Sequence, residues 1–217
     1  MTMRTNITRL FMLTTMLLCF FVNLNAQQLT DREKEALKRR VKDKVEEFQF
    51  YLSQLADKKS TSIEVKNNAY NLALKLFIGE CEDYTVFNPD KGHEELRSAV
   101  RMQTSSRNRT TMSRTLMKRY LNNLRNNKSY SQIEITDADV VRVDNIYKVG
   151  DHYECMAYFC QKFIGIRDER VAYSDITTKK VRVYINAIQI PKADGSTEII
   201  WNALFGDIFV IETKAAY

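Results

Sequence analysis

The sequence predicts an α+β fold, with helices in the first part of the chain and long antiparallel strands in the second. In the first part, apolar residues recur at intervals of three and four, which is typical of a helix with one buried face. After Asn126-Asn127 the apolar spacing changes to two, the period of a strand with one buried face. The chain has no internal repeat, linker or low-complexity stretch. We therefore expect residues 27–217 to form a single domain.

The segment before that domain has the layout of a cleavable export signal. Arg4 and Arg9 precede an apolar run from Leu10 to Val22. The small residue Ala26 then stands before a polar Gln27, which is typical of a cleavage site. The alternative is a membrane anchor, but 13 residues make a helix of roughly 20 Å, shorter than the hydrocarbon core of about 30 Å. We expect a protein exported to the periplasm or medium, with no transmembrane span in the mature chain.

Two helices open the predicted domain. The first begins at a capping box, in which the Thr30 hydroxyl and the Glu33 carboxylate each accept a backbone N–H. Its buried face is predicted to consist of Leu37, Val41, Val45, Phe48, Leu52 and Leu55. Thr61 and Glu64 repeat this spacing at the start of the second helix, and Gly79 is placed for a left-handed C-cap. The second buried face is predicted to consist of Val65, Ala69, Leu72, Leu76 and Phe77.

A less regular segment follows the two helices. Residues 81–87 are interpreted as a short strand, closed by a loop of turn-forming residues over 88–92. Residues 96–105 favour a strand over a helix. A third helix is predicted over 112–125, because apolar residues again recur at helical spacing. Its core-facing residues are Leu116, Met117, Tyr120, Leu121 and Leu124.

The second part of the chain contains four predicted strands. They span residues 132–143, 153–164, 178–190 and 198–213. The last two flank Lys192–Ser196, whose Asp-Gly pair is a strong hairpin signal. Gly206-Asp207 interrupts the final apolar run, which indicates a bulge or bend. The loop from Arg167 to Thr178 is interpreted as a solvated turn, although Asp168, Glu169 and Asp175 offer oxygen ligands for a hard cation.

Charge is unevenly distributed along the mature chain. Loss of Arg4 and Arg9 lowers the formal net charge from +6 to +4. Residues 96–133, which we call the basic segment, contain nine Lys or Arg residues and no Asp or Glu. Export makes nucleic acid a poor partner, whereas an anionic envelope polymer, lipid headgroup or acidic protein would fit this charge. The candidate contacts are Arg114, Lys118 and Arg125, spaced to share one helix face. The favoured alternative is that the basic segment packs beside the chain's own acids.

Cysteine and histidine usage limits disulfides and metal sites. Cys155 and Cys160 are five residues apart in a predicted strand, so they point to opposite faces and cannot bond to each other. A bridge from Cys81 to one of them, or three free thiols, both stay open. Only His93 and His152 could supply imidazole, and no spacing matches a zinc site. We expect no structural metal and no cofactor.

The order of helices, long antiparallel strands and a bent final hairpin resembles the cystatin-like cone of the nuclear transport factor 2-like superfamily. The resemblance covers nearly all of residues 30–214 and implies a curved sheet around the helices, with a pocket at the wide end. The chain also resembles small exported proteins of Gram-negative envelopes. That likeness lies in Gln161-Lys162-Phe163, Tyr173-Ser174-Asp175-Ile176-Thr177 and Gly206-Asp207-Ile208. Neither resemblance assigns a catalytic residue.

Enzymes of that superfamily use carboxylates in an apolar cone, sometimes with a tyrosine donor. Such a site needs an acid made basic by burial and a donor that stabilises an oxyanion. Asp207 is the nearest analogue, because it lies among apolar residues where desolvation would raise its pKa. Tyr184 and Tyr158 are the candidate donors. The favoured alternative is that Asp207 points outward or accepts backbone hydrogen bonds at the bulge.

These observations lead to one preferred function and two alternatives. We expect a non-enzymatic, exported domain that binds a small ligand or an envelope protein, because no catalytic set is assembled in the sequence. The first alternative is an isomerase or hydrolase that uses a pocket carboxylate. The second is an envelope-assembly subunit that contacts partners through the basic segment. A homodimer is compatible with all three, and fold class alone cannot choose among them.

Overall fold

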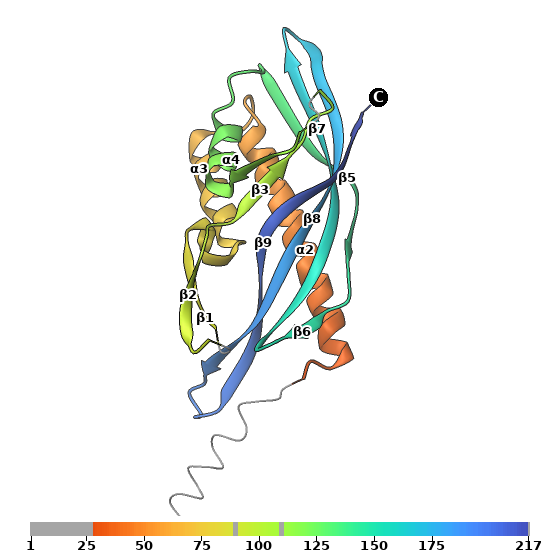
Figure 1. The fold of residues 1–217 in the computed structure, drawn as a ribbon. Helices are drawn as coiled ribbons and strands as arrows, with labels where there is room; N and C mark the ends of the chain where they lie inside the picture. Colours follow the sequence, from red (N-terminus) through yellow and green to blue (C-terminus); the bar gives the residue numbers. More distant parts are fainter. Residues whose placement is uncertain (1–27, 89–90, 109–110, 217) are drawn as a thin grey trace, which may run out of the picture. The chain divides into compact units, whose positions relative to one another are not determined.

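The computed structural model describes residues 28–88, 91–108 and 111–216 (Figure 1). The predicted export signal lies outside these residues. The chain divides into two compact units, residues 1–35 and 36–217. In the first unit, the Thr30 N–H donates to Glu33 Oε2 (2.8 Å) and the Glu33 N–H donates to Thr30 Oγ1 (3.3 Å), which confirms the first capping box.

The α+β class is confirmed, with helices α2 (Asp31–Ala56), α3 (Ile63–Lys75) and α4 (Met117–Arg125) and a short 3-10 helix, η1 (Ile78–Cys81). The predicted stripe of the first helix is buried along α2. The cap of α3 differs from the prediction, because Ser62 accepts the Val65 N–H (3.3 Å) while Thr61 donates to Asp57 Oδ2. Among the described residues, no helix is both long and apolar enough to cross a membrane.

Gly79 adopts the predicted left-handed conformation, but it lies in η1 rather than at the end of α3. Its φ is +62°, and a Cβ there would lie only 2.9 Å from the Tyr84 ring. Glycine is therefore required both by the backbone conformation and by the close approach of Tyr84. The predicted strand over 81–87 begins later than expected, at Tyr84, because Cys81 belongs to η1 and residues 82–83 connect η1 to β1.

The strands form one small and one large sheet. β1 (Tyr84–Asn88) and β2 (His93–Arg97) pair as a two-stranded ribbon. The large sheet has the order β4-β3-β9-β8-β7-β5, with β6 paired to β7. Its strands are β3 (Arg101–Thr104), β4 (Ser113–Leu116), β5 (Gln132–Val143), β6 (Tyr147–Val149), β7 (His152–Arg167), β8 (Arg170–Pro191) and β9 (Thr197–Ala215).

Two sequence predictions about the basic segment are wrong. Residues 96–105 do not form one strand, because β2 ends at Arg97 and β3 begins at Arg101 in the other sheet. The third helix begins at Met117 instead of Met112, since residues 113–116 pair with β3 as β4. The sheet is also mixed rather than purely antiparallel, because Met102 of β3 forms a parallel bridge with Ile208 of β9.

The interpretation of residues 167–178 as a loop is wrong as well. β7 and β8 are joined by a tight turn at Asp168-Glu169, where both residues have positive φ (+50° and +61°). β8 begins at Arg170, so the remaining residues of the predicted loop belong to a strand. The predicted hairpin at 192–196 and the bulge at Gly206-Asp207 are both confirmed, the latter as a register shift in the pairing of β8 with β9.

The apolar core lies between the helices and one face of the large sheet. Phe48 of α2, Phe77 and Phe205 of β9 form an edge-to-face chain, with ring centroids 5.2 and 5.7 Å apart. Figure 1 shows α2 running along the long strands, with α3 and α4 beside it. Along β8 every second residue is buried from Asp175 to Ile185, so this face of the strand points toward the helices.

Candidate ligand-binding cavity

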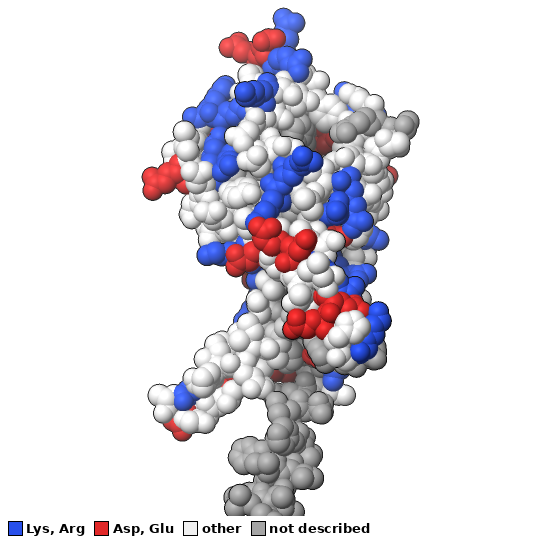
Figure 2. Space-filling view, turned by 60° about the vertical axis from the view of Figure 1, so that its left-hand side comes forward, with Lys and Arg blue, Asp and Glu red and all other residues white. Residues whose placement is uncertain are grey.

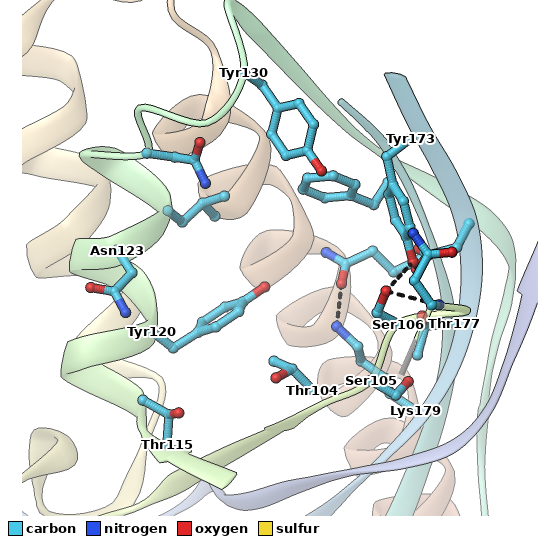
Figure 3. Close-up of a pocket in the computed structure, with 16 residues that line it drawn as sticks. Thr104, Ser105, Ser106, Thr115, Tyr120, Asn123, Tyr130, Tyr173, Thr177 and Lys179 are labelled. Atoms are coloured by element: carbon cyan, nitrogen blue, oxygen red, sulfur yellow. Dashed lines mark hydrogen bonds between the residues drawn. The ribbon is translucent and has the colours of Figure 1, made fainter. Parts of the chain in front are cut away.

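A cavity of about 400 Å³ lies where β7 and β8 pass α4 and the β3–β4 hairpin (Figure 3). Its lining combines buried polar side chains with aromatic rings. This volume is in the range of cavities that hold small ligands. Its mouth is bordered by the more exposed amides Asn108, Asn123 and Asn127.

Strand alternation explains why β8 supplies the polar floor. Asp175, Thr177 and Lys179 are two residues apart, and they are only 4, 6 and 5% exposed. They continue the same inward face on which the buried valines Val181 and Val183 lie. Gln161 of β7 pairs with Thr177 and is 4% exposed, so it joins this polar group from the neighbouring strand.

Lys179 and Gln161 form the basic end of the cavity. Lys179 Nζ donates a hydrogen bond to Gln161 Oε1, as the dashed line in Figure 3 shows. Burial lowers the pKa of Lys179 to about 8, and the Asp175 carboxylate opposes that shift. The buried Nε2 of Gln161 has no hydrogen-bond partner among the described residues. This end therefore contains N–H groups for which the described residues provide no acceptor.

Asp175 forms the acidic end together with Tyr173 and Ser106. The Tyr173 hydroxyl donates to Asp175 Oδ2, lies 3.0 Å from Ser106 Oγ, and accepts the Arg107 N–H at 3.1 Å. Burial raises the pKa of Asp175, although the bond from Tyr173 and the charge of Lys179 work against that rise. The carboxyl group is consequently held by an internal network rather than left free in the cavity.

Aromatic rings form the remaining wall. Tyr130 lies against Phe163 and Phe163 against Tyr173, with centroids 5.8 and 6.0 Å apart. Tyr130 reaches this position because residue 165 is glycine, where a Cβ would lie 2.5 Å from the tyrosine ring. On the other side, the Tyr120 side chain points from α4 into the cavity, and burial raises its pKa. The cavity thus has a wall of aromatic rings, packed edge to face, beside a polar floor.

Asp207 and the two candidate tyrosines do not line this cavity. Asp207 accepts the Arg101 N–H (2.7 Å) and forms an ion pair with Arg114, so its carboxylate joins β9 to β3 and β4. Tyr184 packs on Gly206, where a Cβ would lie 2.7 Å from its ring. Tyr158 lies under the Arg142 guanidinium, 4.2 Å from the ring centroid. The structure therefore does not bring these three residues together around this cavity.

The three candidate contacts of the basic segment each have a partner within the chain. Arg114 pairs with Asp207 and Lys118 with Glu82, which raises the pKa of Lys118. Arg125 donates to Asn67 Oδ1 (2.9 Å) and lies over the Tyr70 ring. They do not share one helix face, because Arg114 lies on β4. Figure 2 shows acidic and basic side chains next to one another on the face that it presents.

The three cysteines of the described residues, Cys81, Cys155 and Cys160, are free thiols, so neither possible bridge from Cys81 is formed. Burial raises the pKa of Cys81 and Cys155 to about 12, which makes both poor nucleophiles at neutral pH. Cys160 is partly exposed and lies on the opposite face of β7 from Cys155, as predicted.

The possible cation ligands of residues 167–178 are not brought together. Asp168 forms the turn between β7 and β8, while Asp175 lies buried in the cavity. Within the described ranges, no three His, Cys, Asp or Glu side chains are grouped so that they could hold a metal ion. His152, the more buried of the two histidines, lies 3.1 Å from both the Asp151 and the Glu154 carboxylates.

The sequence contained one signal for this cavity that its interpretation did not use. Within the predicted strand over 178–190, Lys179 is in phase with Val181, Val183 and Ile185, all of which are buried. A lysine on the buried face of a strand is unusual, because a charge is seldom buried without a partner.

No family model, curated protein or solved structure matches this chain.

Proposed function

We propose that this chain is an exported, non-enzymatic domain of the cell envelope that binds a small ligand in the cavity between α4 and β7–β8. The observation that carries the proposal is the buried Lys179–Gln161 pair at the floor of a cavity of about 400 Å³. A stable core would close this space with apolar side chains, because buried N–H groups without acceptors cost free energy. A bound ligand would supply those acceptors.

The location in the envelope rests on the residues before Gln27. A positive start, a short apolar run and Ala26 before a polar residue support export. N-terminal sequencing of the protein recovered from its native host should begin at Gln27. Recovery of the full chain in the membrane fraction, with Met1 retained, would contradict this part of the proposal.

The fold family is part of the same proposal. The order of helices before long strands, and the bulge at Gly206 in the last strand, support a cystatin-like arrangement of the nuclear transport factor 2-like type. The described sheet is not strongly curled, so any cone would be shallow. In this arrangement the cavity between the sheet and α4 corresponds to the pocket that the resemblance implies.

Ligand binding can be tested by filling the cavity from its mouth. Asn123→Trp would place an indole beside the cavity lining, whereas Asn122→Trp adds the same group one residue away, on an exposed position outside the lining. In a fragment screen followed by amide NMR, the wild type and Asn122→Trp should show shifts around Gln161 and Lys179. Asn123→Trp should lose them. Equal binding by all three proteins would contradict the proposal.

A second candidate function, catalysis by a pocket carboxylate, is favoured by one observation. Asp175 is 4% exposed, its pKa is raised by burial, and it lies beside the Tyr173 hydroxyl in the same cavity. Such a carboxyl group could act as a base toward a substrate that displaces Tyr173. Turnover of any bound compound that is lost in Asp175→Asn, with binding retained, would favour this enzyme over the binding domain.

A further inference from the structure

The basic end of the cavity has more hydrogen-bond donors than acceptors. The Lys179 ammonium carries three N–H groups, and its hydrogen-bond partner within the described chain is Gln161 Oε1. The Gln161 amide adds two N–H groups at Nε2, and neither has a partner in the described residues. Both side chains are at least 95% buried, so bulk water has little access to them. A ligand that satisfies this end must bring acceptor atoms.

The charge at this end is not neutralised by direct contact. Lys179 and Asp175 are four residues apart on one face of β8, which separates their Cα atoms by roughly 13 Å at about 3.3 Å per residue. No ion pair joins them in the described part of the chain, and Asp175 is instead bound by Tyr173. An anionic acceptor would therefore stabilise Lys179 more than a neutral one.

The walls limit what can be attached to that acceptor. Tyr130 and Phe163 present rings on one side, and Tyr120 and Leu124 of α4 close the other. Such surfaces favour an apolar or aromatic body. The volume of about 400 Å³ matches a small molecule.

We infer that the ligand is a small organic acid whose carboxylate accepts hydrogen bonds from Lys179 Nζ and Gln161 Nε2, while its apolar body lies against Tyr130 and Phe163. This inference rests on the proposed ligand-binding function and adds the chemical class of the ligand. The planar carboxylate offers two acceptor oxygens, which matches two neighbouring donor groups from adjacent strands.

The test compares acids with their uncharged amides of nearly the same shape. Acetate, benzoate and indole-3-acetate are each titrated against the corresponding primary amide by calorimetry and amide NMR, with benzamidine as the cationic counterpart of benzoate. At least one acid should bind about tenfold or more tightly than its amide, because a charge-assisted bond is stronger than a neutral one. Benzamidine should bind more weakly than benzamide.

Variants of the basic end test whether Lys179 and Gln161 cause the tighter binding of acids than of amides. Lys179→Met should reduce the acid's affinity to that of its amide, while Lys180→Met, which removes the next lysine on the opposite sheet face, should leave it unchanged. Gln161→Met should lower the affinity for the acid by a smaller factor than Lys179→Met does. It serves as the second variant if Lys179→Met does not fold. Thermal melting and far-ultraviolet circular dichroism check each fold.

The two proposals fail in different ways. If neutral fragments bind in the cavity but no acid exceeds its amide, or if Lys179→Met keeps the preference, the organic-acid inference is overturned while ligand binding stands. If no compound shifts the signals of Gln161 or Lys179, both the inference and the proposed function fail.

Discussion

The inward face of β8 has two halves that are buried alike and built differently. Asp175, Thr177 and Lys179 occupy one half, at 4–6% exposure. Val181, Val183 and Ile185 occupy the other, at 0–1%. Both halves belong to one strand and follow one alternation of side chains. The difference between them therefore lies in what faces them across the fold.

The apolar half belongs to the close-packed core. Val183 pairs with Phe205, whose ring contacts Phe77, which in turn contacts Phe48 of α2. The polar half faces the cavity, where Lys179 Nζ donates to Gln161 Oε1 and Gln161 Nε2 has no hydrogen-bond partner among the described residues. Close packing in the core accounts for the apolar side chains of Val181, Val183 and Ile185. Packing does not account for the polar half, since apolar residues at 177 and 179 would be easier to bury. We expect the polar half to be less stabilising than an apolar one, as the proposed binding function would allow.

We expect the largest effect on the free energy of unfolding when a lysine is introduced into the apolar half of β8. Val183→Lys would place an ammonium at a fully buried position in the apolar core. We expect a loss of about 4 kcal/mol or more in the free energy of unfolding, because an unpaired charge is buried. Urea denaturation at pH 7 measures it, with Arg182→Lys on the opposite face as the control. A loss under about 1 kcal/mol would show that the two halves tolerate charge equally.

A smaller effect is expected on the pH dependence of stability when the charge of Lys179 is removed. Its pKa is about 8 in the folded chain against 10.5 for the unperturbed group, so the unfolded state binds more protons between these pH values. The wild type should therefore become more stable as the pH rises from 8 to 10.5, by on the order of 3 kcal/mol. Lys179→Met should lack this rise.

Denaturation at several pH values, each compared with Lys180→Met, isolates the contribution of Lys179. The loss of the Gln161 hydrogen bond in Lys179→Met is independent of pH in this range and cancels in the comparison. Identical pH dependence of the wild type and Lys179→Met would mean that Lys179 is as well solvated as a surface lysine.

The smallest effect is expected at the acidic end. The pKa of Asp175 is raised above 3.8, so the folded state holds its proton after the unfolded state has lost it. Wild-type stability should fall as the pH rises from 3.8 through the folded pKa. Asp175→Asn keeps an oxygen that accepts from Tyr173 and should be the more stable protein at pH 7. The two free energies should converge below pH 3.8. A variant less stable than the wild type at pH 7 would indicate that the ionised carboxylate is stabilising.

Local patterns in the sequence were enough to predict several of the regular helices, strands and turns of this chain. The boundaries of β5 (Gln132–Val143) match the prediction, and the buried stripe of α2 and the 192–196 hairpin are confirmed. Alternation, helical spacing and turn residues act over a few positions, so they can be followed along the chain without knowing its partners. The polar turn residues at 167–178 misled the same reasoning, because a two-residue turn at Asp168-Glu169 leaves the rest free to extend β8.

Tertiary structure alone decided the contacts between distant residues. Residues 113–116 became a strand because β3 offers a pairing edge, and Asp207 binds Arg101 and Arg114 because the bulge of β9 brings these segments together. The cavity joins Tyr120, Gln161 and Lys179 from three separate elements. The sequence by itself determined that Lys179 shares a strand face with buried valines. Whether that face would meet packed rings or an open cavity depended on long-range packing, which no local period encodes.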